Sequence, residues 1–200
     1  MLHRVITAVV CVAFPVITAA FFYGATRQTN GEGERVRIPA IPGFRFAYRW
    51  VQLSTAAIVL GELFFDGHWA LLQVFGALPL TYLGVAICVV AGAIFIWAKV
   101  RLGGQFSPCC DSLVANRLID TGPYAYVRHP IYSANLAWQL GALLATGSLW
   151  IIINVAILLL YYVTSARQEE QALSKELPEY RDYMARTGAF LPPPLPRRAR

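Results

Sequence analysis

Charged residues are scarce in this chain. Only 14% of its 200 residues are Asp, Glu, Lys or Arg, whereas an average soluble protein has about 25%. Apolar types make up 57%. A disordered chain needs much charge and few apolar residues, so the composition excludes one. A soluble body of 22.1 kDa cannot bury this much apolar surface. We therefore expect an all-α integral membrane protein.

Histidine and cysteine are also few. His3, His68 and His129 lie far apart, Cys11 and Cys88 lie inside apolar runs, and no Cys-x-x-Cys pair exists. This pattern predicts neither a disulfide framework nor a metal site. The chain also lacks the glycine-rich phosphate and dinucleotide motifs, the His-Glu-x-x-His helix and the Gly-x-Ser-x-Gly turn. A nucleotide-binding domain of the Rossmann type is therefore not expected.

Acidic residues are outnumbered, with 11 Asp and Glu against 17 Lys and Arg. In a soluble protein this excess could indicate a nucleic-acid partner. In a membrane protein it follows from the collection of Lys and Arg on the cytoplasmic side. We therefore predict contact with membrane lipids and no nucleic-acid partner.

Five apolar runs predict about five transmembrane helices. They cover residues 5–23, 50–65, 69–98, 131–145 and 149–165. About 20 residues cross a bilayer, so the last two runs, which are short, are expected to form a tilted helical hairpin over 131–165. The first run could instead be a secretory signal peptide, but it is long for one and no clear cleavage site follows. A charged surface helix is expected over 167–186.

The basic residues predict the orientation of the chain. If the chain crosses the membrane five times, sixteen of the 17 Lys and Arg lie on one side of the membrane, and only Arg4 lies on the other. The N terminus is then outside, and the C terminus and active site are cytoplasmic, in the inner membrane if the cell is bacterial. Residues 1–98 hold spans one to three, and 99–200 form the cofactor-binding region. No oligomeric state is indicated.

Gly84, Cys88 and Gly92 recur every four residues within one apolar run. Small residues at this spacing line one stripe of a helix and allow another helix to approach closely. We expect this packing to occur within the monomer, with a dimer seam as the second interpretation.

Polar groups gather on both sides of the expected hairpin. The loop 99–130 and the segment after Ser165 flank its cytoplasmic end, so they must be neighbours. His129 precedes Pro130, which suits the first turn of a helix, and the free N–H groups of such a turn favour an anion. Simpler interpretations exist for both groups. The arginines and tyrosines could anchor the chain on anionic lipid. Glu169-Glu170 could simply complement the positive end of a helix dipole at its N-terminus.

Several blocks in the last hundred residues resemble one family. They are Asn116-Arg117-Leu118-Ile119, Gly122-Pro123-Tyr124, Arg128-His129-Pro130-Ile131-Tyr132, Glu169-Glu170 with Leu173, Glu179-Tyr180 with Tyr183, and Phe190-Leu191-Pro192. Together they resemble the isoprenylcysteine carboxyl methyltransferase family, whose relatives include phospholipid N-methyltransferases. The first two spans are similar only in hydropathy.

The resemblance implies an S-adenosylmethionine-dependent membrane methyltransferase and a set of cofactor contacts. Carried over, these contacts are Asn116, Leu118, Ile119, Tyr124, His129, Pro130, Ile131, Tyr132, and Glu169 or Glu170. Asn116 stands where the family usually has histidine. Arg128 is expected to hold the cofactor carboxylate together with the helix N-terminus. Arg167 is the nearest counterpart of an arginine thought to touch substrate in eukaryotic members.

The expected reaction is methyl transfer to a lipophilic or lipid-linked acceptor that enters from the bilayer. Carboxyl methylation is the first choice, because a carboxylate is already ionised at neutral pH and needs no general base. Methylation of a phospholipid amine is the nearest rival, and His129 or a glutamate could then accept the proton. Two further classes of protein stay open at this point: an NADPH-dependent enzyme similar to sterol reductases, and a non-catalytic membrane module.

Overall fold

The computed structural model describes residues 2–28, 38, 41–64, 77–105 and 117–193, with side chains at 2–3, 21–28 and 62–63 outside the description. Most of these residues are helical, and no strand occurs among them. The elements are α1 (Leu2–Gln28), α2 (Phe44–Phe64), α3 (Leu78–Leu102), η1 (Gly103–Gln105), η2 (Gly122–Ala125), α4 (Pro130–Thr146), α5 (Trp150–Glu176) and α6 (Tyr180–Arg186).

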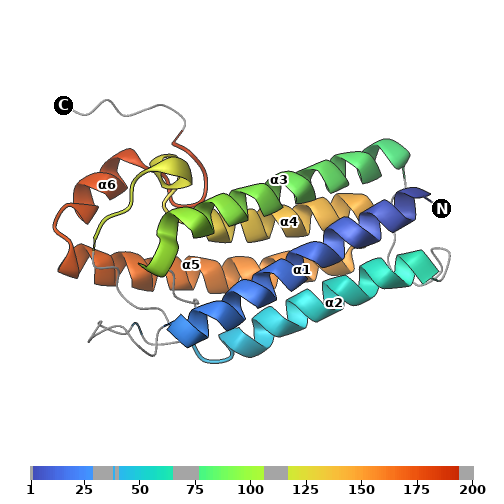
Figure 1. The fold of residues 1–200 in the computed structure, drawn as a ribbon, viewed down its shortest axis with the longest axis horizontal. Coiled ribbons are helices and arrows are strands. Elements are labelled where there is room, and N and C mark those ends of the chain that lie inside the picture. Colours follow the sequence, from blue (N-terminus) through green and yellow to red (C-terminus); the bar gives the residue numbers. More distant parts are fainter. Residues whose placement is uncertain (1, 29–37, 39–40, 65–76, 106–116, 194–200) are drawn as a thin grey trace.

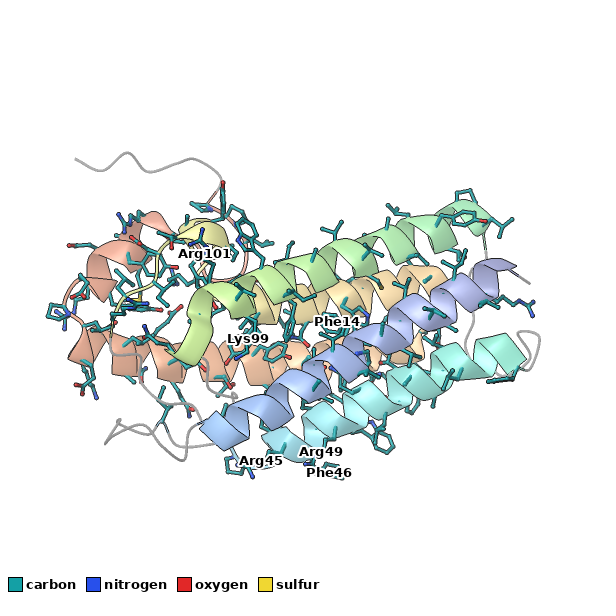
Figure 2. The ribbon with its side chains drawn as sticks, viewed as in Figure 1. Phe14, Arg45, Phe46, Arg49, Lys99 and Arg101 are labelled. Carbon is teal, nitrogen blue, oxygen red and sulfur yellow. The ribbon has the colours of Figure 1, made fainter. Side chains whose placement is uncertain are left out.

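The five long helices form a bundle in which each runs opposite to the one before it (Figure 1). The ends of α1, α3 and α5 therefore meet the starts of α2 and α4 at one end of the bundle. The η2 turn and α6 lie at this same end (Figure 1). Arg45 and Arg49 of α2, together with Lys99 and Arg101 of α3, also lie toward it (Figure 2).

The helices begin and end where the local sequence requires. The expected hairpin is present as α4 and α5, and Gly147 ends α4 in the left-handed conformation with φ 69°, its N–H donating to the Leu143 carbonyl at 2.7 Å. The separate surface helix expected over 167–186 is wrong. α5 continues through Glu176 because nothing in that stretch breaks a helix, and it stops before Pro178, after which α6 begins.

The helix expected as the second span, α2, begins earlier than expected, at Phe44 rather than at residue 50. Its first two turns carry Arg45 and Arg49 and precede the apolar run, so sequence hydropathy alone does not detect them. Residues 69–76, expected to open the third span, lie outside the described residues, and α3 is described from Leu78.

The small-residue stripe of α3 packs within the chain. An added Cβ at Gly84 would lie 2.4 Å from the Gly141 carbonyl oxygen, and one at Gly141 would lie 2.7 Å from Cys88 Sγ. The backbones of α3 and α4 are therefore almost in contact. Cys88 Sγ also lies 3.9 Å from Cys11 Sγ of α1, so the stripe joins three helices.

Aromatic rings fill the centre of the bundle. Phe14 of α1 stacks on Trp138 of α4, with ring centroids 4.9 Å apart, and meets Phe95 of α3 edge-on at 5.4 Å. Phe14 lies inside the bundle, where α1 crosses in front of α4 (Figure 2). Such rings bury a large apolar area and prefer these offset or edge-on contacts.

Among the described residues, two helical segments are long and apolar enough to cross a membrane. They are Leu78–Gln105 and Trp150–Glu176. In the most apolar stretch of each segment, only 28% and 33% of the residues, respectively, are buried inside the structure. Their outward faces carry large apolar side chains, among them Val100 and Leu160, which are 69% and 68% exposed. The core helix of a soluble protein would cover such faces. In α1, Arg4–Ala20 forms a shorter apolar segment.

The contact between α3 and α4 leads to a first prediction. Gly84→Ala should destabilise the protein by about 1 to 3 kcal/mol, because its Cβ would overlap the backbone of α4. Gly92→Ala in the same helix is the matched control, since its Cβ would lie 3.8 Å from Phe14 in ordinary contact. Thermal unfolding in detergent, followed by circular dichroism, measures both. Equal melting temperatures for the two variants would contradict the packing.

Candidate functional site

Three segments distant in sequence meet at the end of the bundle that holds α6. They are the start of α4, the charged end of α5 and the segment after α6. The Arg128 N–H donates to the Gly188 carbonyl at 2.8 Å, and the His129 N–H donates to the Ala189 carbonyl at 3.0 Å. The Ser133 hydroxyl donates to the Phe190 carbonyl at 2.7 Å. The chain after α6 is therefore bound along the entrance to α4.

Glu170 links the two basic side chains that precede α4. Its Oε1 accepts from Arg128 Nε at 2.8 Å and lies 2.9 Å from His129 Nε2. Arg128 Nη1 donates to the carbonyl oxygens of Thr187 and Met184. One guanidinium thus connects the loop before α4, the end of α5 and the chain after α6.

Glu170 lies just beyond the apolar part of α5, which ends at Ser165. Burial by itself would raise the pKa of the Glu170 carboxyl, but its hydrogen bonds with His129 and Arg128 hold this pKa below the ordinary value of 4.5. Glu170 is therefore ionised at neutral pH, and its charge is committed to the chain's own cations.

Glu169 faces the same histidine from the other side. Its Oε1 accepts from the Tyr132 hydroxyl at 2.5 Å, and its Oε2 lies 3.5 Å from His129 Nδ1. His129 is 7% exposed, so its ring is buried between the two carboxylates. Glu169 accepts a hydrogen bond from a neutral hydroxyl, whereas Glu170 is bound by a guanidinium.

A column of aromatic rings runs from these carboxylates into the bundle. His129 stacks on Tyr132 with centroids 5.4 Å apart and an interplanar angle of 6°. Tyr132 in turn stacks on Tyr162 of α5 at 4.4 Å and 10°. Phe190, from the segment after α6, lies 5.8 Å from His129. The site therefore has aromatic walls beside its carboxylates.

Tyrosines fix the η2 turn against α6. The Tyr183 hydroxyl donates to the Tyr124 carbonyl at 2.6 Å, and Arg186 pairs with Asp120 at 2.5 Å. Burial raises the pKa of the Tyr124, Tyr180 and Tyr183 hydroxyls well above the ordinary value of 10. These hydroxyls stay neutral, so they are hydrogen-bonding groups rather than bases.

The structure brings most of the predicted site residues together. Tyr124, Arg128, His129, Tyr132, Glu169 and Glu170 share this end of the bundle, and Pro130 and Ile131 form the first turn of α4. Leu118 and Ile119 are half-buried just before η2, Arg167 is exposed, and Asn116 lies outside the described residues.

The sequence analysis did not propose Tyr162 or Ser165 as site residues. Both share one helical face with Glu169, at spacings of three and four residues, so helical periodicity could have found them. Phe190 was part of a block that carried the family resemblance, but its contact with His129 is decided by the tertiary fold. Ser165 Oγ is buried, one turn before Glu169, and has no hydrogen-bond partner among the described residues.

The charges of the site do not favour an anion. Arg128 and a protonated His129 would at most balance Glu169 and Glu170, so the four side chains are neutral or negative together. No group of three or more His, Cys, Asp or Glu suited to a metal ion occurs within the described ranges. The site is thus suited to a cation with aromatic or hydrogen-bonding parts.

The fold and site define a helical protein with candidate membrane spans and a buried carboxylate–imidazole cluster. Its sequence matches the family model of the phospholipid methyltransferases over residues 80–179, a range that includes α4, α5, almost all of α3 and the site residues from Tyr124 to Glu170, but not the chain after α6. The chain belongs to the phospholipid methyltransferase family.

Two curated proteins with similar sequences are named for metal resistance. The chain is 31% identical over 143 residues to the cobalt-zinc-cadmium resistance protein CzcN of Cupriavidus metallidurans, covering 71% of this chain and 60% of that protein. It is 31% identical over 144 residues to the nickel-cobalt-cadmium resistance protein NccN of Alcaligenes xylosoxydans xylosoxydans, covering 71% and 61%. The chain thus spans about three fifths of the length of these relatives.

The ion-pair cluster leads to a second prediction, on pH. Because the folded pKa of Glu170 is depressed, its contribution to stability is complete above the unfolded pKa, about 4.3, and is lost as the pH falls through the folded value. Glu170→Gln should cost about 1 to 3 kcal/mol at pH 6 and should lose less stability than the parent on acidification to pH 4.

Melting temperatures at pH 6 and pH 4 measure this effect. Glu176→Gln, an exposed residue at the end of the same helix, is the matched control and should behave as the parent does. A Glu170→Gln variant with the parent's stability and pH response would show that the cluster is not an ionic link.

Proposed function

We propose that this protein is an integral membrane methyltransferase that takes its methyl group from S-adenosylmethionine and transfers it to a lipophilic acceptor. The observation that carries the proposal is the cluster of His129, Tyr132, Glu169 and Glu170 inside the family-matched region. Two carboxylates, stacked rings and a helix N-terminus form one site there, although they lie up to 41 residues apart in sequence.

The residues present are suited to S-adenosylmethionine. When bound, it supplies an electrophilic methyl group on a positively charged sulfonium. The neutral or negative balance of the site favours such a cation, and aromatic faces attract it. The buried Ser165 hydroxyl, which no group in the described part of the chain pairs with, offers a further hydrogen bond. Tyr124 and Tyr132, whose rings are buried here, would shape the pocket and exclude water.

The structure suggests a division of roles for the two glutamates and the arginine. Glu169 is proposed to bind the cofactor's amine or ribose, because its carboxylate lies beside the stacked rings of His129 and Tyr132. Glu170 and Arg128 are proposed as positioning residues that hold His129, since Arg128 Nε and Nη1 already bind groups of the chain. In α4, the N–H groups of the first turn would receive the cofactor carboxylate.

We further propose that the five long helices all cross the membrane, with the N terminus outside and the site on the cytoplasmic side. The alternating helix directions and the exposed apolar faces of α3 and α5 support this topology (Figure 1). Residues 1–98 would then form three spans and 99–200 the cofactor-binding region. The acceptor would approach from the bilayer between helices.

An amine of a phospholipid head group is the acceptor that the charges favour. Arg128 and His129 are already balanced by Glu169 and Glu170, so no excess positive charge attracts a carboxylate. A protonated amine must lose a proton before it can be methylated, and His129 or one of the two glutamates would accept that proton.

Carboxyl methylation of a prenyl-linked or other lipophilic acid is the second candidate. Arg167, exposed two residues before Glu169 on α5, could bind such a carboxylate. The two relatives named for metal resistance also favour it, because converting a carboxylate to an ester removes a metal ligand from a membrane component.

Cofactor binding is the third prediction. Titration calorimetry with S-adenosylmethionine should detect binding to the parent, and Glu169→Gln should weaken it about tenfold or more through loss of a charged contact. Glu176→Gln should bind as the parent does. Unchanged affinity in Glu169→Gln would contradict the assigned role of Glu169. Binding of NADPH in place of S-adenosylmethionine would indicate a reductase, and binding of neither would indicate a non-catalytic module.

The acceptor is the subject of the fourth prediction. Membranes containing the protein, incubated with methyl-labelled S-adenosylmethionine, should yield labelled phospholipid. Mild base should not release the methyl label from its head group. Label released by mild base as methanol would mark a methyl ester and support the carboxylate candidate. Membranes containing the Glu169→Gln variant serve as the control and should incorporate little label.

A further inference from the structure

The start of α2 packs against the aromatic column of the site. Phe44, the first residue of α2, is 0% exposed. Its ring meets the Tyr162 ring edge-on, with centroids 6.0 Å apart and an interplanar angle of 62°. It also lies 5.1 Å from the ring of Tyr161, the neighbouring residue of α5. A helix outside the family-matched residues 80–179 therefore contacts the column.

The turn before α2 directs the Phe44 ring into the bundle. Gly43 has a φ of 77°, a conformation that favours glycine. A Cβ at Gly43 would lie 3.1 Å from the Tyr161 hydroxyl, so the turn itself is close to α5. Arg45 and Phe46, the next two residues, are exposed and lie on the outer side of α2 (Figure 2). Of the two aromatic residues that open α2, Phe44 is therefore the one committed to the interior.

The aromatic column carries this contact to the charged end of the site. Tyr162 stacks on Tyr132 at 4.4 Å, and the Tyr132 hydroxyl donates to Glu169 Oε1 at 2.5 Å. Tyr132 also stacks on His129 at 5.4 Å. All four rings of this row, from Phe44 to His129, are at most 7% exposed. Because buried side chains are close-packed, one ring of such a row cannot move without its neighbours.

A ring at position 44 therefore has an effect beyond the burial of apolar surface. A smaller side chain there would leave space beside Tyr162, and the side chains around such a space relax partly into it. A tilt of Tyr162 would move Tyr132, whose hydroxyl holds Glu169. A binding group that is misplaced by about 1 Å can cost an enzyme about a hundredfold in rate.

We infer that Phe44 is a positioning residue of the methyl-transfer site, and that it acts through Tyr162 and Tyr132 to hold the Glu169 carboxylate in place for the cofactor. This inference rests on the proposed function. It assigns α2 a role in cofactor binding in addition to its proposed role as a membrane span.

The test measures cofactor affinity by titration calorimetry. Phe44→Leu should raise the dissociation constant of S-adenosylmethionine about three- to tenfold, because Glu169 is no longer held in place. Phe14→Leu is the matched control, since Phe14 is 3% exposed and packs on two rings outside the aromatic column, those of Trp138 and Phe95. It should lower the melting temperature by a similar amount and bind the cofactor as the parent does. Equal affinities of the two variants would overturn the inference.

A second measurement needs no cofactor. It uses carbon-13 NMR spectra of protein labelled at the tyrosine ring carbon that bears the hydroxyl, with Tyr132→Phe to assign the Tyr132 signal. In Phe44→Leu this signal should shift, because the hydrogen bond from Tyr132 to Glu169 changes, and in Phe14→Leu it should keep the parent's position. An unshifted signal in Phe44→Leu would overturn the inference. If Phe44→Leu does not fold, Phe44→Met takes its place, since methionine fills irregular space without supplying a ring.

Tyr132→Phe also completes a double-mutant cycle. In that background Phe44→Leu should weaken cofactor binding less than it does in the parent, because the hydroxyl through which Phe44 acts is gone. Additive effects of the two changes would show that Phe44 does not act through Tyr132. Absence of S-adenosylmethionine binding to the parent would contradict the proposed function, while the NMR result would still test the link from Phe44 to Glu169.

Discussion

The contact of Glu170 with Arg128 and His129 is the interaction on which the candidate site depends. It joins the end of α5 to the residues before α4, and through Arg128 it also holds the chain after α6. None of these charges could remain buried alone, because an unpaired buried charge is strongly unfavourable. Together they place the His129 ring between two carboxylates and orient it for the aromatic column behind it.

The same constraint applies deeper in the bundle. Between apolar helices no water is at hand to satisfy polar groups, so each must find a partner in the protein or in a ligand. At the α4 entrance, protein groups meet most of this need. Deeper in the bundle, Gln139 Nε2 and Asn154 Oδ1 have no hydrogen-bond partner among the described residues. The polar groups at the α4 entrance are therefore held by the chain's own bonds, and the deeper ones are held less completely.

Close packing supports both regions. Gly84 and Gly141 allow α3 and α4 to approach until their backbones almost touch, and this contact fixes α4 relative to the rest of the bundle. The N-terminus of α4 presents His129 and Tyr132, so an error in that packing would move the site. Membership of the phospholipid methyltransferase family agrees with this arrangement, since the matched range runs from α3 through the site to the end of α5.

The sequence alone determined the helical class, the hairpin and the neighbourhood of the site, because these depend on local signals. Apolar runs mark the helices, Pro130 begins α4 and Gly147 ends it. It also indicated that Tyr124, His129 and Glu169 would share one region, since a hairpin returns the chain to its starting side. Which atoms meet was decided only by the tertiary structure. The pairing of Glu170 with Arg128, the stacking of Tyr162 on Tyr132 and the unpaired amide of Gln139 depend on the rotation and depth of each helix. Rotation and depth follow from side-chain packing across the whole bundle, which no local pattern contains.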